Sequence, residues 1–145
     1  MEARLQLEPG LAKYAGLRAT PEQIQLMRRL LDKVKTMSRG DPDQIELWDS
    51  AFHRAIADAA GNRLLLGLFD AVDAIRRDPS WLAVRNAARN QERLNRYDDH
   101  HERIVEHIAA CHPKEAARGM REHRLALQQA LLSTLNDDDE DLIDY

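Results

Sequence analysis

The chain has 145 residues, of which 43% are hydrophobic and 32% are charged, and its net charge is -4. This length and composition fit one compact domain with a well-solvated surface. They exclude a membrane-spanning segment, because no run approaches the roughly 18 consecutive apolar residues that such a segment needs, and the N-terminus lacks a signal-peptide pattern. The single cysteine, Cys111, cannot form an internal disulfide, so we expect a cytoplasmic location.

The negative charge is concentrated at the C-terminus. Residues 137–145 contain six carboxylates and no basic side chain, and without them the net charge changes from -4 to +2. Acidic runs of this kind are typically solvated and disordered. We therefore predict a folded domain over residues 1–136 and a disordered acidic tail over 137–145. The folded part is not basic enough to bind nucleic acid by itself.

Proline and glycine residues separate long segments that have helical periodicity. Thr20 followed by Pro21 marks a helix N-terminus, and apolar residues at three- and four-residue steps then continue to about Gly40. Further helices are predicted over residues 42–60, 64–77, 80–97, 98–111 and 113–135. No useful length of sequence alternates with the period of a strand. The sequence therefore predicts an all-α, antiparallel bundle of six or seven helices.

Four polar residues interrupt the apolar faces of these helices. Asp49 and His53 are four residues apart, on a helical face that they share with apolar neighbours. His101 and His123 stand at three- and four-residue steps from apolar residues on the last two helices. All four should therefore point into the bundle, where an unpaired polar group costs on the order of a few kcal/mol. A divalent cation removes this cost, because it binds these side chains in their deprotonated forms.

Three imidazoles and one carboxylate suit zinc or nickel, and also iron, cobalt or manganese. Protein ligands on one side of the ion would leave positions for water or an oxygen-rich small molecule. The spacing alone leaves two alternatives open: each histidine could be a hydrogen-bonded core residue, and Asp49 could pair only with His53. His100 and His107 share a different helical face and are expected to face solvent.

Several separated segments resemble one known family. Residues 49–62 (DSAFHRAIADAAGN) resemble the signature of the C-terminal effector-binding (FCD) domain of GntR-family transcriptional regulators, in its metal-binding subgroup. Residues 101–108 (HERIVEHI) and 116–123 (AARGMREH) match further family stretches in the expected order, and residues 2–9 (EARLQLEP) are similar to the family's first helix. The resemblance covers nearly all of residues 1–136. It departs at Cys111-His112-Pro113, where the family usually has a small residue, aspartate and proline.

The resemblance implies a central metal and ligand cavity, with Asp49, His53, His101 and His123 as the metal ligands. It also implies that the effector is a small organic acid whose oxygens complete the metal coordination. Arg4 matches a family arginine that reaches toward this cavity, and a guanidinium can hold a carboxylate through two parallel hydrogen bonds. The alternative for Arg4 is a surface salt bridge with Glu8, one helical turn further on.

Smaller expectations concern helix ends. Asn62 is expected to cap the helix that follows it, with a ligand contact as the alternative. Arg76 and Arg77 could line the pocket, but they are expected to be solvated at a helix end.

The function that the resemblance implies is a ligand-sensing and dimerisation domain, not an enzyme. DNA binding would belong to an N-terminal winged helix-turn-helix that is absent from this chain. Exposed apolar residues on the first and fourth helices would form a homodimer interface, since a dimeric DNA-binding protein matches an operator with two half-sites. The alternative is a metal-dependent hydrolase that uses the same three histidines and aspartate. Against it, Glu102 is next to His101 and should face away, so no general base is evident.

Overall fold

The computed structural model describes residues 1–37 and 40–140. In this part of the chain there are seven α-helices, one 3₁₀ turn and no strand: α1 (Glu2–Arg18), α2 (Pro21–Met37), α3 (Pro42–Ala59), α4 (Arg63–Ala74), η1 (Ile75–Arg77), α5 (Pro79–Ala87), α6 (Gln91–Ala109) and α7 (Pro113–Glu140). The prediction of an all-α bundle of six or seven helices is confirmed. Of the predicted acidic tail, residues 137–140 continue α7, and 141–145 lie outside the described residues. No helix within the described ranges has the length and apolar character that crossing a membrane requires.

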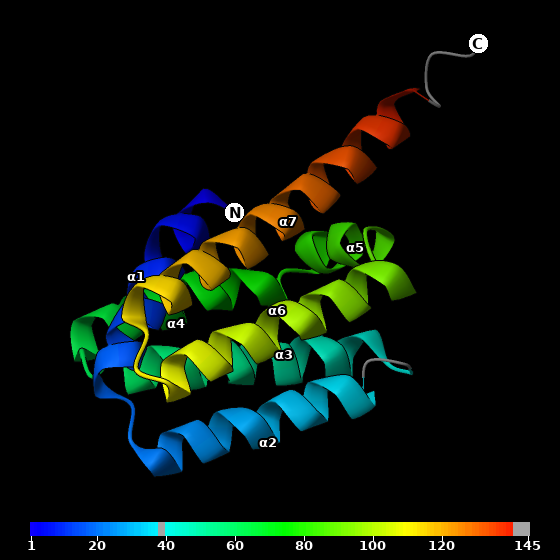
Figure 1. The fold of residues 1–145 in the computed structure, drawn as a ribbon. Helices are drawn as coiled ribbons and strands as arrows, with labels where there is room; N and C mark the ends of the chain where they lie inside the picture. The colour runs from blue at the N-terminus through cyan, green and yellow to red at the C-terminus, as the bar shows by residue number, and fades with distance from the viewer. Residues whose placement is uncertain (38–39, 141–145) are drawn as a thin grey trace.

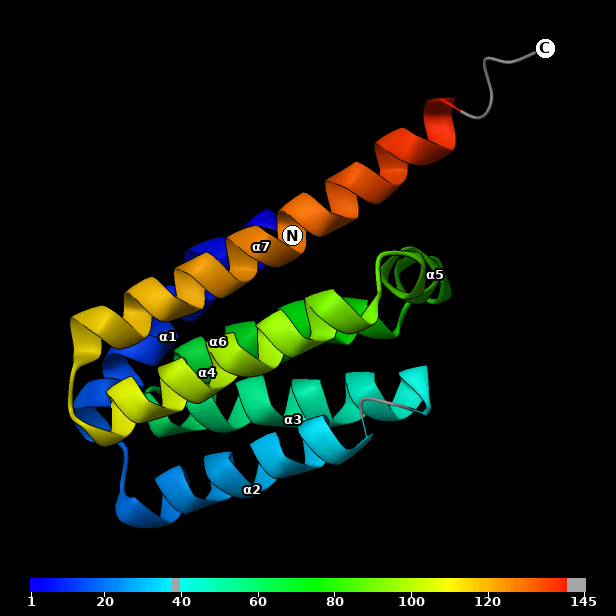
Figure 2. The same ribbon diagram turned by 45° about the vertical axis from the view of Figure 1, so that its right-hand side comes forward.

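The helices form a bundle in which α7 packs along α1 and α6. The C-terminal part of α7 extends past the rest of the bundle, as Figures 1 and 2 show. Helix α3 packs against α2, α1 and α4, and α6 packs against α2. The short helix α5 lies at one end of the bundle and contacts α7 and η1 (Figure 2). This arrangement brings the inner faces of α3, α6 and α7 together.

The main hydrophobic core lies between these inner faces and those of α1 and α2. Phe52 and Ile56 from α3 pack there with Ile104 from α6 and Met120 from α7, and all four side chains are almost completely buried. Burial of each such side chain stabilises the fold by roughly 1.5–3 kcal/mol. The stripes of apolar residues that predicted these helices therefore form the core that holds them.

Side-chain caps fix most helix starts. The Asn62 oxygen accepts hydrogen bonds from the backbone nitrogens of Leu64 (3.0 Å) and Leu65 (3.1 Å), which confirms its predicted role. The predicted boundary at residues 97–98 is wrong, because α5 ends at Ala87 and α6 begins at Gln91. The Asn90 side chain accepts a hydrogen bond of 2.8 Å from the backbone nitrogen of Arg93 and so caps α6. This break contains neither proline nor glycine, so the usual helix-breaking residues do not reveal it.

Candidate metal centre

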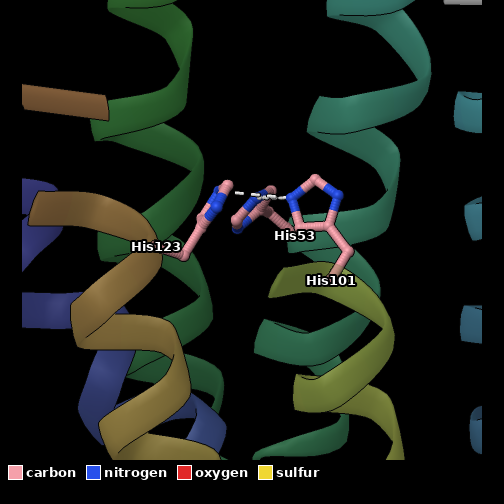
Figure 3. A group of neighbouring side chains, drawn as sticks. All are labelled: His53, His101 and His123. Carbon is pink, nitrogen blue, oxygen red and sulfur yellow. Dashed lines mark hydrogen bonds between the residues drawn. The ribbon is translucent and has the colours of Figure 1, made fainter. Parts of the chain in front are cut away.

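Three buried histidines from three helices meet in the core. His53 from α3, His101 from α6 and His123 from α7 are each 1% exposed. The Nε2 atom of His101 lies 3.3 Å from that of His53 and 3.2 Å from that of His123. Figure 3 shows the three side chains pointing toward one another from their helices. One nitrogen from each of the three rings lies within 4.8 Å of the others. A tetrahedral zinc ion with Zn–N bonds of about 2.0–2.1 Å separates its nitrogen ligands by roughly 3.3 Å, so these rings fit a metal site.

For two of these imidazoles, burial favours the neutral form, which is the form that binds metals. It lowers the pKa of His101 to about 3, against the opposing effect of the Asp49 carboxylate. Burial also lowers the pKa of His123 well below its ordinary value, and the neighbouring His101 and His53 add to this effect. The core therefore contains a three-histidine cluster that could hold a metal ion, and the identity of the ion is open.

Asp49 lies beside this cluster, one turn before His53 on α3. Its Oδ1 atom is 3.5 Å from Nε2 of His101 and 3.7 Å from Nε2 of His53. Burial opposes ionisation of Asp49, but Arg76 and the neighbouring histidines outweigh it and hold the pKa of the carboxyl well below its ordinary value. The structure thus brings all four predicted residues into one place. That Asp49 is a fourth metal ligand stays a prediction.

Glu8 supports His53 from the other side of its ring. The Oε2 atom of Glu8 is 2.6 Å from Nδ1 of His53, and both side chains are almost fully buried. Burial opposes the charge on Glu8, but Arg124 and Arg4 outweigh it, so the pKa of this carboxyl is well below its ordinary value. A charged carboxylate on the far nitrogen of a metal-binding histidine fixes the orientation of the ring.

Arg4 is buried, at 5% exposed, and forms an ion pair with Glu8. The expected partner is therefore present, but the pair lies inside the protein and not at its surface. Both Nη atoms of Arg4 lack a hydrogen-bond partner among the described residues, and Nη1 is 3.8 Å from Asp73. Arg4 borders a cavity of about 80 Å³ that Arg76 and Arg85 also line. A role for Arg4 in binding an effector stays a prediction.

A separate cavity of about 50 Å³ adjoins the histidines. Its polar wall includes His101, His123, Asp49, Glu46, Arg85 and Arg89. Its apolar wall comes from α2, α3, α6 and α7, with Ala88 between α5 and α6. The space is larger than one water molecule needs, which is about 10–15 Å³ by the same measure. Two of the three histidines, His101 and His123, therefore face a small, partly enclosed cavity with both charged and apolar walls.

The expectation that Arg76 is solvated is wrong. Arg76 is 7% exposed, and its Nη2 atom donates hydrogen bonds to Glu46 Oε2 at 2.6 Å and to Asp49 Oδ2 at 2.7 Å. Because η1 continues directly from α4, its arginine is carried against α3 and not into solvent. Arg77, the next residue, is exposed as expected.

Sequence reasoning missed Glu46, Arg85, Arg89 and Arg124 as parts of this region. Glu46 stands three residues before Asp49, so the helical period places both on one face, and Arg124 directly follows His123. Arg85 and Arg89 had no such signal, because they lie close to the break between α5 and α6, which the sequence did not reveal.

The other expectations near the site concern exposed groups. His100 and His107 are both partly exposed. Glu102 is exposed and pairs with Lys35 on α2, so it faces away from the histidine cluster and cannot serve there as a general base.

Comparisons with known proteins agree on one family. The FCD domain family matches residues 1–126. The chain is 29% identical over 141 residues to the Uxu operon transcriptional regulator of Escherichia coli, covering 96% of this chain and 55% of that protein. It is 30% identical over 126 residues to the HTH-type transcriptional repressor NanR of Cronobacter sakazakii, covering 84% of this chain and 46% of that protein. The HTH-type transcriptional regulator LutR of Bacillus subtilis is 29% identical over 139 residues, covering 90% of this chain and 60% of that protein.

Solved structures show the same architecture. Streptococcus agalactiae GntR matches with a TM-score of 0.74 and 25% identity, over 89% of this chain and 56% of that one. Escherichia coli McbR/YncC has the same fold, with a TM-score of 0.76 and 19% identity, over 94% of this chain and 62% of that one.

This chain spans about half the length of the curated relatives that it matches. These relatives are transcriptional regulators and not enzymes, in agreement with the prediction that the domain is not an enzyme. The chain belongs to the FCD domains of GntR-family transcriptional regulators, and its buried three-histidine cluster is consistent with the metal-binding subgroup.

Proposed function

We propose that this domain senses a small organic acid at a divalent metal held by Asp49, His53, His101 and His123, with zinc or nickel as the expected ion. The observation that carries the proposal is the convergence of three buried Nε2 atoms, two of which belong to histidines that line a small cavity. The metal, when bound, supplies fixed positive charge and open positions for carboxylate or hydroxyl oxygens.

The residues around the centre have distinct roles in this proposal. Asp49 and the three imidazoles hold the ion, and Glu8 holds the ring of His53 in place. The Nη atoms of Arg4, which lack a hydrogen-bond partner among the described residues, offer hydrogen bonds to an acid that enters from the side of α1. The apolar walls exclude water and select for the shape of the acid.

Binding would act through the helices that the centre joins. Since α3, α6 and α7 each contribute a ligand, an acid that binds one packing arrangement better than another shifts the population toward it. The names of two relatives describe them as HTH-type, and this chain spans only part of their length. We propose that a winged helix-turn-helix attached to this domain reads DNA in the cytoplasm, and that its geometry follows the packing of the sensing domain.

Homodimerisation is part of the same proposal. Leu17 on α1 and Leu64 and Leu68 on α4 are exposed, and α1 packs against α4. Large apolar side chains exposed on adjoining helices are typical of a protein interface. A second copy of the domain is the partner that a regulator would need to bind two half-sites of a DNA operator.

His101→Ala tests the metal centre, with His112→Ala as the matched control because His112 is exposed at a turn. Elemental analysis and native mass spectrometry of the purified domain report the metal, any co-purified acid and the number of copies. We expect one divalent ion per chain in the wild-type and His112→Ala proteins, and loss of the ion and of organic-acid binding in His101→Ala. A folded His101→Ala protein that retains as much metal as the wild type would overturn the assignment, and metal-dependent turnover of simple esters would favour the hydrolase.

A further inference from the structure

Three arginines surround the carboxylate of one buried residue, Glu46. Arg76 donates to Glu46 Oε2 from Nε at 3.1 Å and from Nη2 at 2.6 Å. On the other oxygen, Oε1, Arg85 donates from Nε at 2.9 Å, and Arg89 donates from Nη2. We call Arg76, Arg85 and Arg89 the arginine cradle. A single carboxylate with both oxygens bound by guanidinium groups shows that the cradle has the geometry of a carboxylate-binding site.

The arginine cradle adjoins the metal centre. Arg85, Arg89 and Glu46 line the same cavity as His101 and His123. Arg76 also contacts Asp49 at 2.7 Å, and Nη2 of Arg85 is 4.0 Å from the same oxygen. A molecule bound at the histidines through one end would therefore have the cradle within reach of its other end. With a cavity of only about 50 Å³, such a molecule would have to displace a side chain from its wall.

The charges around this cavity favour an anionic ligand. Ion pairs connect five buried or nearly buried arginines: Arg4, Arg76, Arg85, Arg89 and Arg124. Their partners are four carboxylates: Glu8, Glu46, Asp49 and Asp73. A divalent ion would add positive charge beside this network, and the carboxylates of an anionic ligand offset it in a region where unmatched charge is costly.

We propose that the arginine cradle is a second carboxylate subsite, which Glu46 occupies until an effector displaces it. The effector class is then a small dicarboxylic acid: one carboxylate binds at the metal and the other replaces Glu46 between the arginines. Glu46 thus competes with the ligand from within the protein and sets the threshold for binding. This inference rests on the proposed function for the first carboxylate only, since the cradle is made by the protein alone.

Two acids that differ only in the distal carboxylate test the class. Malate and 2-hydroxybutyrate have the same number of carbons and the same 2-hydroxy acid group for the metal, and only malate has a second carboxylate. Calorimetric titration of the metal-loaded domain should give malate an affinity about 10–100-fold higher, the effect of a hydrogen-bonded charge pair. Arg89→Met should abolish this preference, whereas Arg77→Met, at an exposed arginine, should preserve it. Equal affinity for the two acids would overturn the subsite and leave the metal-dependent function standing.

A second variant examines the cradle without any metal. Glu46→Ala leaves the three guanidinium groups without their carboxylate, so acetate should bind there and raise the melting temperature of the variant in EDTA. The wild type, whose cradle is filled, should show no such rise. If acetate fails to stabilise Glu46→Ala, the cradle is overturned whatever the metal does. A different result would overturn the metal-centred function: each acid, malate and 2-hydroxybutyrate, would bind the wild type with the same affinity in EDTA as in the presence of metal.

Discussion

His53 has a partner on each nitrogen of its ring. Its Nε2 atom faces His101 at 3.3 Å, and its Nδ1 atom lies 2.6 Å from Glu8. Glu8 in turn pairs with Arg4, and its Oε1 atom is 3.9 Å from Nε of Arg124. A metal-binding histidine depends on such a partner for the tautomer that it adopts and the direction in which its free nitrogen points. Glu8 is therefore a positioning residue for the metal centre, although it belongs to α1 and cannot reach the metal side of the ring.

Glu8→Ala should weaken metal binding about 10–100-fold, the usual cost of losing a partner behind a metal ligand. Glu8→Gln should recover part of the affinity, because its amide oxygen can still lie against Nδ1 of His53. Competition with a chelator of known affinity measures the effect, and circular dichroism checks that both variants are folded. Both variants remove the charge that faces Arg4 and Arg124, so their difference isolates the orientation of His53. Equal metal affinity in the wild type and a folded Glu8→Ala protein would contradict this role.

At the scale of elements, α1 depends on a close approach to the start of α7. A Cβ atom added at Gly16 would lie 2.9 Å from Cα of Pro113, a backbone atom that cannot move aside cheaply. Gly10, on the same helix, has open space around the equivalent position. The two glycines of this helix therefore have opposite effects on stability: Gly16 permits close packing against α7, whereas Gly10 only weakens the helix.

Gly16→Ala should lower the free energy of unfolding by about 1–3 kcal/mol, as overpacking of a close contact typically does. Gly10→Ala is the control and should raise it by about 0.5–1 kcal/mol, because alanine favours the helix. Urea denaturation followed by circular dichroism measures both values. Stabilisation by Gly16→Ala as large as that by Gly10→Ala would show that the α1–α7 contact is looser than the structure has it.

At the scale of the whole molecule, the metal centre would join helices that are far apart in the sequence. His53, His101 and His123 come from α3, α6 and α7, so an ion bound by all three favours the folded bundle over the unfolded chain. Ligand binding to the native state alone adds about 4 kcal/mol when the free ligand is 1,000 times its Kd. Metal binding should therefore be visible in global stability.

Removal of metal with EDTA should lower the melting temperature of the wild-type domain, and returning zinc or nickel should restore it. His101→Ala should melt at one temperature with and without the ion, since it has lost the ligand between the other two rings. Differential scanning calorimetry provides the measurement, and His112→Ala is again the matched control. A wild-type melting temperature that does not change with metal would count against a bound ion at this centre.

The sequence by itself determined the helical fold and the inward direction of Asp49 and the three histidines. Both follow from the helical period, which can be recognised within a short stretch of sequence. Each histidine lies on an apolar stripe of its helix, and that stripe is buried in the folded protein. The convergence of three helices at one point is not local, and it was predictable only because the motifs resemble those of a known family. The prediction failed locally at Asn90, where a polar cap and not proline or glycine restarts the helix.

Only the tertiary structure decided the charge network around the site. Glu46 pairs with Arg76, Arg85 and Arg89, which are 30, 39 and 43 residues further along the chain. An arginine at a helix end looks solvent-exposed in the sequence, as Arg76 did, because a charged side chain is stable in water on any helix. It becomes a buried partner only where packing places a carboxylate opposite it, and that depends on how α3, η1 and α5 are arranged in space.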